Sequence, residues 1–441
     1  MKQFLIGVFF LKNIIALSQS ADSSYLIKIP VFYFPFQKNV IKTYHNYFDL
    51  PINPSMNQSL YWSNSFYSLS HYYLSKYVKK DKIKELSILT FDILTFYTPL
   101  GLAWLHEEYH RAVLTKYNAK SFNDIYKFPF FKSFVSVSHV ADEDLVRIAN
   151  NYKADFIRLN SAGIESQIMQ VKTLQQSNFY SLKPINFITI YLYNILNTSL
   201  YIMSCSKVSS DKLVNDMIKE EGSNIEIRDI TGLDFTAWVD ALYNPDKPYE
   251  ARGIHPSGVG YNRYIKVADL SSDEKNYLKK QAYLSLLNLI APSIYGINKI
   301  EWKNFGKFNF AFRHFLTPFG NNVSIDFFFK KESMNIYIAI HTYSNKNKTF
   351  PGLEYSIFDY PIFQKKLNLA FSNNIWIQPY SMSFYDNKGK LGTAISLCLS
   401  SNSGKLMPYI EAEYKTKGWL PANVYLEENY SINAGLKMKI N

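Results

Sequence analysis

The sequence predicts an α+β protein, in which a mainly helical N-terminal region is followed by an antiparallel β-barrel of about eight strands. Apolar residues make up 47% of the 441 residues and charged residues only 19%, which excludes a disordered chain. Apolar, helix-like stretches occupy residues 83–299, and a two-residue alternation of apolar and polar side chains begins near residue 300. We therefore divide the chain into four segments, with bounds 1–21, 22–82, 83–299 and 300–441.

Charge and cysteine content limit the chemistry of the chain. The formal net charge of +12 comes from lysines scattered through loops and strand ends, so it does not predict nucleic-acid binding. The only cysteines are Cys205 and Cys398, too few for a disulfide framework or a thiolate zinc site. Any metal must therefore be bound by histidine and carboxylate side chains.

The N-terminus has the pattern of an exported protein. Residues 1–21 combine an early lysine, an apolar stretch and small residues at Ser20 and Ala21, which is typical of a secretory signal peptide. An uncleaved anchor helix is the alternative. In the Tyr- and Phe-rich segment 22–82, the stretch SYLIKIPVFYFPF is either a strand or an extended arm.

Four apolar stretches predict helices in the segment 83–299. The first covers 83–118, with Pro99 marking a kink or a break, and the others cover 160–176, 185–204 and 281–297. Several are about long enough to cross a bilayer, but polar residues and prolines interrupt them, so core helices and membrane spans both remain open. The interruptions are Asp92, Pro99, Asn186, Asn194, Asn197 and Pro292.

A loop-rich insertion, residues 206–280, separates the third and fourth stretches. It begins with a short expected helix, SSDKLVNDMIKEEG, capped by Ser209 or Ser210 and ended by Gly222. The motif LSSDEKNYLKKQ starts the next helix with a Ser/Glu capping pattern. Long loops inside a compact domain are often functional, so this insertion is a candidate wall of an active site.

Eight alternating segments after residue 300 predict a β-meander. Short turns such as SNKNKT, YDNKGK and SNSGK separate them, and closing the sheet into a barrel would remove its edges. The even strand number, the aromatic content of 17% and the exported N-terminus favour an outer-membrane barrel, whereas the modest length of some segments favours a soluble β-domain. The segments are 307–315, 323–331, 334–344, 366–372, 374–382, 393–401, 407–417 and 431–440.

The stretch AWLHEEYHRAVL, residues 103–114, carries the strongest chemical signal. On a helix, His106 and His110 lie on one face, and Glu107 can reach a water bound at the same point. This is the H-E-x-x-H pattern of two metal ligands and a base in zinc metallopeptidases. The alternative, a surface helix with solvated imidazoles, is disfavoured by the apolar flanks, since buried charge needs a partner such as a cation. Glu108 is expected to pair with Lys116 or Arg111.

Zinc usually has a third protein ligand, and Glu165 is the leading candidate. It lies beside the apolar stripe of the second predicted helix, and the small residues 161–163 would let this helix approach the first one closely. An ion pair with Arg111 or Arg158 is the alternative for Glu165. The other candidate ligands are His139, Asp142, Asp144, Asp155 and His255.

Residues 86–176 resemble the gluzincin class of zinc metallopeptidases, in which a glutamate on a later helix completes the H-E-x-x-H site. The resemblance implies zinc bound by His106, His110 and Glu165, with Glu107 as general base in peptide hydrolysis. Many gluzincins carry an acidic residue four positions after the third ligand, where this chain has Met169. Support for a ligand histidine would then come from elsewhere, with Asp155 or Asn160 as candidates.

The Gly-rich loop RGIHPSGVGYNRY is a candidate source of a donor to the oxyanion of the reaction. His255, Tyr261 and Tyr264 have the required chemistry, and His255 and Tyr261 are our leading candidates. The alternative is an ordinary surface loop in which Pro256 and Gly258 set a turn.

We expect a zinc-dependent endopeptidase of the bacterial cell envelope, acting on peptides or proteins, with the β region in the outer membrane. One alternative is a non-catalytic outer-membrane barrel or channel with a helical plug or docking domain. Another is a polytopic inner-membrane zinc protease, in which the apolar stretches are true spans. Cleavage specificity and oligomeric state stay open.

Overall fold

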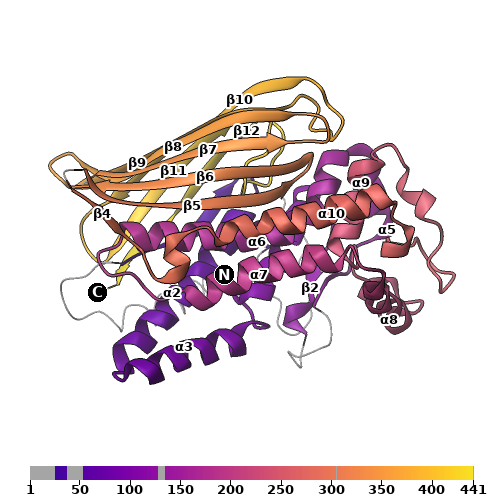
Figure 1. The fold of residues 1–441 in the computed structure, drawn as a ribbon, viewed down its shortest axis with the longest axis horizontal. Coiled ribbons are helices and arrows are strands. Elements are labelled where there is room, and N and C mark those ends of the chain that lie inside the picture. Colours follow the sequence, from indigo (N-terminus) through magenta and orange to yellow (C-terminus); the bar gives the residue numbers. More distant parts are fainter. Residues whose placement is uncertain (1–24, 37–52, 128–134, 304, 333, 441) are drawn as a thin grey trace.

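The computed structural model describes five stretches of the chain, and it confirms the α+β arrangement of helices followed by an antiparallel sheet (Figure 1). The predicted signal peptide, residues 1–21, lies outside the described residues. Those described are 25–36, 53–127, 135–303, 305–332 and 334–440.

One antiparallel sheet contains ten strands in the order β1-β12-β11-β10-β9-β8-β7-β6-β5-β4. The N-terminal strand pairs with the C-terminal one, with Tyr25 opposite Ile440. A separate two-stranded sheet joins β2 (Phe122–Asn123) to β3 (Val137–Ser138). The ten strands are β1 (Tyr25–Phe34), β4 (Ile300–Trp302), β5 (Gly306–Thr317), β6 (Gly320–Lys331), β7 (Met334–Ser344), β8 (Thr349–Ile362), β9 (Leu367–Pro379), β10 (Gly389–Ser401), β11 (Leu406–Lys415) and β12 (Asn429–Ile440).

Nine helices are present in the described chain, followed by 3-10 turns after the last of them. They are α2 (Met56–Tyr77), α3 (Asp81–Thr95), α4 (Leu102–Lys116), α5 (Asp142–Asn151), α6 (Lys153–Tyr180), α7 (Ile188–Ser204), α8 (Asp211–Glu221), α9 (Asp234–Tyr243) and α10 (Ser272–Ser285), with η7 (Leu286–Leu289) and η8 (Pro292–Tyr295) after α10.

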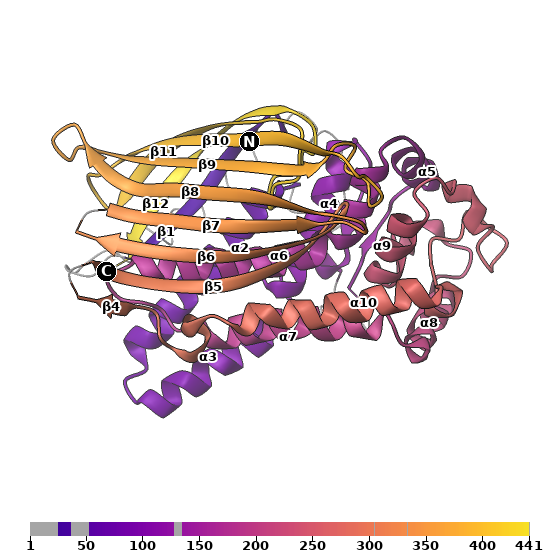
Figure 2. The same ribbon diagram turned by 45° about the horizontal axis from the view of Figure 1, so that its top comes forward.

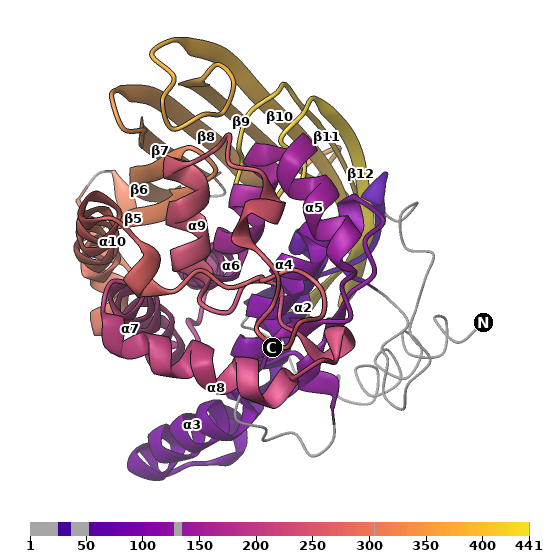
Figure 3. The ribbon, with the colours of Figure 1, turned by 90° about the vertical axis from the view of Figure 1, so that its right-hand side faces the viewer.

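The sheet is not closed into a barrel in the described chain, because β1 and β4 are its two edges and do not pair. Figure 3 shows it curving as an arc over the helices, with α6 beneath its concave face. Helix α2 packs against β1, and α6 packs against β5. Helices thus occupy the side on which closure would join the edges, and the predicted closed barrel is not confirmed.

Eight strands were predicted after residue 300, whereas nine are present in the described chain, β4 to β12. Residues 366–372 and 374–382 were predicted as two strands, but β9 runs unbroken through Asn373 and Asn374. Strand β8 was missed, because Pro351 and Gly352 gave its sequence the character of a turn. The stretch SYLIKIPVFYFPF, predicted as either a strand or an extended arm, contains strand β1.

The helix predictions agree with the structure in most cases. The chain breaks around Pro99, between the end of α3 and the start of α4, and α8 ends at Gly222, whose φ is 52°. Ser271 and Glu274 form the predicted capping box. The fourth stretch, 281–297, is not one helix, because α10 ends at Ser285 and 3-10 turns follow. Within the described residues, no helix combines the length and apolar character needed to cross a bilayer.

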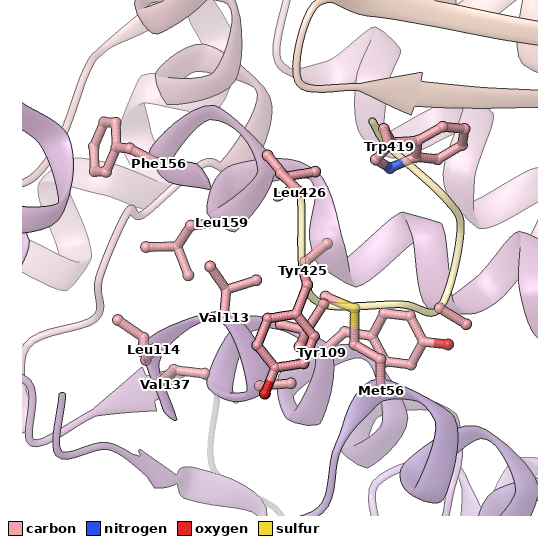
Figure 4. Packing of buried hydrophobic residues seen from close by; sticks show 14 of the residues in the cluster. Met56, Tyr109, Val113, Leu114, Val137, Phe156, Leu159, Trp419, Tyr425 and Leu426 are labelled. Carbon is pink, nitrogen blue, oxygen red and sulfur yellow. The ribbon is translucent and has the colours of Figure 1, made fainter. Parts of the chain in front are cut away.

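The helices and the sheet share their hydrophobic cores. One buried cluster joins Leu159 of α6, Val113 of α4 and Leu426 from the loop before β12 (Figure 4). A second cluster joins α7 to β6 and β12. The predicted boundary at residue 300 therefore separates helices from strands, but the two parts pack into the same hydrophobic clusters.

Helix α6 is buried along most of its 28 residues although it carries many polar side chains. The fully buried Arg158 and Glu165 form an ion pair of 2.8 Å on this helix. The Glu165 carboxylate also accepts hydrogen bonds from Trp419 Nε1 at 3.2 Å and from the Ala422 backbone N–H at 2.8 Å. The pair therefore ties α6 to the loop that connects β11 to β12.

Replacing Arg158 by leucine is expected to destabilise the fold strongly. The substitution leaves the Glu165 carboxylate buried without its cation, which costs about 3–5 kcal/mol in free energy of unfolding. Chemical denaturation followed by circular dichroism measures this change. The double variant Arg158→Leu, Glu165→Leu should recover much of the loss, because it removes the isolated charge. Equal losses in the single and double variants would contradict the role assigned to the pair.

Candidate metal centre

Two imidazoles and one carboxylate converge where helices α4 and α9 meet. The Asp234 Oδ2 atom lies 3.2 Å from His106 Nε2 and 3.5 Å from His110 Nε2. Among the described residues, this is the only group of His, Cys, Asp and Glu side chains whose ligand atoms converge as a metal site requires, all within 4.8 Å. Asp234, the first residue of α9, thus takes the position predicted for Glu165.

The spacing of these atoms fits a tetrahedral zinc ion. Zinc binds nitrogen and oxygen ligands at about 2.0–2.1 Å, so two tetrahedral ligands lie about 3.3 Å apart. The two distances from Asp234 Oδ2 lie close to this value. These two distances are therefore compatible with a tetrahedral zinc site.

His110 is oriented as a metal ligand. Its Nδ1 lies 2.5 Å from the Leu159 carbonyl oxygen, which can only accept, so Nδ1 carries the proton. Its Nε2 is buried and makes no hydrogen bond. A buried nitrogen lone pair without a donor, facing a carboxylate, is a position that a cation would satisfy.

His106 lies against helix α6 at Gly163. A Cβ atom on Gly163 would lie 2.1 Å from His106 Nε2, so any larger residue would displace the imidazole. This confirms the prediction that small residues let the second helix approach the first one closely. Helix α6 therefore supports both histidines, with Gly163 beside His106 and the Leu159 carbonyl bonded to His110.

Asp234 is held in place by Tyr201 of α7. The Asp234 backbone N–H donates to the Tyr201 hydroxyl at 3.1 Å, and the Tyr201 ring centroid lies 6.4 Å from that of His106. Tyr201 is half-buried and donates its own proton to no described residue. A phenol donor therefore lies beside the three ligand groups.

Negative charge accumulates around the site. Burial, together with Asp229 and Asp234, raises the pKa of Glu107 well above its usual value. Burial and Asp234 also raise the pKa of Asp229 to about 7. Glu107 makes no hydrogen bond or ion pair with a described residue. These carboxyl groups favour binding of a cation, which would restore their ionised forms.

The two imidazoles differ in their protonation. Burial lowers the pKa of His106, and its hydrogen bond to Asp234 does not offset this effect. Burial acts in the same direction on His110, but Asp234 and the Leu159 carbonyl outweigh it and raise the pKa. Burial would raise the pKa of Asp234, but the two histidines hold it well below its usual range.

Glu165 does not belong to the metal centre. Its carboxylate is neutralised by Arg158, which was the alternative considered from sequence. Asp142, Asp144 and Asp155, also considered as ligands, pair with basic residues instead. Their partners are Arg263 at 2.7 Å, Arg147 at 2.5 Å and Lys116 at 2.8 Å, respectively. The expected pair of Glu108 with Arg111 is confirmed at 2.7 Å.

The predicted donors His255 and Tyr261 belong to a neighbouring cluster. The His255 ring bonds to Ser257 at 2.9 Å, and the Tyr261 backbone N–H donates to Asp142 at 2.8 Å. That cluster is organised by the buried Arg263–Asp142 pair. No described contact joins His255 or Tyr261 to the three ligand groups, so we do not assign them to the reaction.

The remaining candidates also have other partners. Tyr264 donates to Glu221 at 2.6 Å, and His139 Nδ1 bonds to the Ser138 hydroxyl at 2.8 Å. Asn160 donates to the Phe156 carbonyl at 3.0 Å. The histidine support expected from Asp155 or Asn160 is supplied for His110 by the backbone of Leu159 instead.

Comparisons with protein-family models, with curated proteins and with solved structures found no match to this chain. The functional argument therefore depends on the geometry of the site.

The choice between Asp234 and Glu165 as third ligand can be tested by metal content. We expect one equivalent of zinc in the wild-type protein and in Glu165→Gln, because Glu165 lies outside the centre. Asp234→Asn should bind zinc much more weakly, since the amide is a poor ligand next to two imidazoles. Elemental analysis after dialysis measures both. Zinc lost from Glu165→Gln and kept in Asp234→Asn would reverse the assignment.

The stability of the metal-free protein should fall as the pH rises from about 4 to about 7, the interval between the ordinary and the folded pKa of Asp229. Glu107, Asp229 and His110 have raised pKa values, so their stabilising contributions are present at low pH and are lost as the pH rises through the folded values. The lowered pKa of His106 acts in the opposite sense. Zinc should remove this decline, because it favours the deprotonated groups. Thermal unfolding at several pH values, with chelator or with zinc, checks both expectations.

Proposed function

We propose that this protein is a zinc-dependent peptidase. The observation that supports this best is the set of two imidazoles and one carboxylate, whose ligand atoms lie within 4.8 Å of one another, with Glu107 on the turn between the two histidines. Structural zinc sites use four protein ligands, whereas catalytic sites use three and keep one position open. The described residues offer three.

Zinc, when bound, would polarise the scissile carbonyl and increase the acidity of a water molecule. Glu107 then accepts a proton from the attacking water and passes it to the leaving nitrogen. The raised pKa of Glu107 belongs to the metal-free site, and a bound cation would lower it and supply the carboxylate that a general base needs. The Leu159 carbonyl keeps the proton of His110 on Nδ1, leaving Nε2 for the metal.

Tyr201 is the best placed donor to the developing oxyanion. Its hydroxyl accepts from the Asp234 backbone, which fixes the oxygen and leaves the proton available. A donor oriented before the reaction stabilises negative charge without reorganisation. Tyr201 thus takes the role expected of His255 or Tyr261.

The signal-like residues 1–21 support a location in the bacterial cell envelope, where peptide or protein substrates would be met. The non-catalytic alternative has less support, because a helical plug does not require a half-buried Glu107 between two converging imidazoles.

Two substitutions at the site should abolish or reduce turnover while zinc is kept. Glu107→Gln removes the base and should lower kcat by about 100-fold or more. Tyr201→Phe removes the donor and should lower kcat by about 100-fold with little change in KM. Tyr261→Phe is the matched control and should cleave at the wild-type rate. Hydrolysis of a fluorescence-quenched unfolded protein, with zinc content measured in parallel, provides the assay. A Glu107→Gln protein that cleaves normally would reject the mechanism.

A further inference from the structure

The concave face of the sheet mixes buried polar and apolar side chains, whereas most outward side chains on its convex face are apolar. In β6, Asn322, Ser324 and Asp326 are buried toward the helices, while Val323 and Ile325 face the other way. Asp326 pairs with Arg313 of β5, which also contacts Gln175 of α6. In water-soluble sheets the buried face is normally the apolar one.

The convex face carries a continuous apolar band. Most outward positions of β7 to β12 are apolar, and the exposed fraction reaches 53% at Ile340 and 54% at Ile410. No described segment covers this face (Figure 2). At about 4.8 Å between strands and 3.4 Å per residue, the band spans roughly 700 Å², more than a soluble monomer usually exposes. One member from each strand is Ile340, Leu353, Ile375, Leu397, Ile410 and Ile432.

Aromatic and basic residues border the band at its ends. At the end with the short hairpins, Trp302, Phe305 and Phe363 are exposed, together with the lysines 303, 331, 365 and 366. At the other end, Tyr380 and Tyr430 are exposed. Aromatic rings at both limits of an apolar band are typical of protein surfaces that meet lipid headgroups, and lysines suit anionic headgroups.

We propose that the convex face of the sheet is embedded in a lipid bilayer that contains anionic lipids. Strands β5 to β12 have 10 to 14 residues, and a tilted strand needs about 9–11 to cross the hydrocarbon layer. The proposal extends beyond the peptidase activity and does not depend on zinc.

The interior beneath the sheet supports lipid as the occupant. A cavity of about 600 Å³ lies between α6 and the concave face, and its lining includes the charged residues Lys28, Glu411, Asp359 and Lys437. Polar lumens inside apolar walls are the pattern of membrane sheets, in which water fills the inside and lipid surrounds the outside. A second copy of the chain would cover the band, but it gives no reason for aromatic residues at both ends or for lysines along one rim.

Depth-dependent quenching tests the proposal. Single cysteines at positions 340, 396, 397 and 254 are labelled with an environment-sensitive fluorophore in the Cys205→Ala, Cys398→Ala chain. The full-length protein is reconstituted in vesicles of phosphatidylethanolamine and phosphatidylglycerol that carry nitroxide on their acyl chains. Ile340→Cys and Leu397→Cys should be quenched several-fold more than inward-facing Ser396→Cys. Ile254→Cys is the matched control, because Ile254 is equally apolar and 61% exposed but lies in the loop-rich insertion.

Three outcomes would overturn the proposal. One is equal quenching at positions 340 and 254. Another is protein that stays in the aqueous phase during vesicle flotation while its circular dichroism shows the native strand content. The third is a detergent-free dimer in which the label at position 397 is shielded by the second copy. Stronger vesicle binding with phosphatidylglycerol than with phosphatidylcholine, weakened by Lys365→Gln and Lys366→Gln, would support the role of the basic rim.

Discussion

The buried ion pair between Arg158 and Glu165 is the interaction on which the rest of the structure depends. A charged pair inside a protein is tolerated only when its remaining hydrogen-bonding groups are satisfied. Here Arg158 donates to the Asn423 carbonyl at 2.6 Å, and Glu165 accepts from Trp419 and from the backbone of Ala422. These bonds fix the depth at which α6 lies beneath the sheet, because the strand-connecting loop supplies the partners.

The fixed position of α6 sets the geometry of the candidate metal centre. The ion pair encloses the turn of α6 that presents Gly163 to His106, and the Leu159 carbonyl is one residue after Arg158. The Leu159 carbonyl and the side-chain-free Gly163 therefore both lie on α6, whose position the ion pair fixes. Asp234 arrives from a different part of the chain, on α9, whose Trp238 donates to the Thr317 carbonyl at the end of β5. The site thus lies between α4, supported by α6, and α9, and both α6 and α9 are bonded to the sheet or its loops.

Local patterns predicted the site only where the ligands are close in sequence. The i, i+4 spacing of His106 and His110 fixes their common face on any helix, so this part needed no tertiary information. Glu165 and Asp234 are both acidic residues beside apolar ones. The sequence pattern does not reveal that Glu165 forms an ion pair with a basic side chain whereas Asp234 faces the two histidines. The same limit applies to the sheet. Alternation indicates which side chains share a face, but closure depends on what lies between the two edges, and here α2 packs against β1 and α6 against β5.

The candidate metal centre and the apolar convex face lie in different parts of the structure. With the apolar band in lipid, the zinc ligands would lie beyond the strand ends that carry the longer loops, away from the lysine rim (Figure 2). One buried apolar cluster gathers where α4, α6 and the β11–β12 loop meet (Figure 4), and a second joins α7 to β6 and β12. The first cluster lies beside the histidines and stiffens their helix. If the proposed peptidase function holds, substrate would reach Glu107 from the aqueous side, where the water that hydrolysis consumes is available.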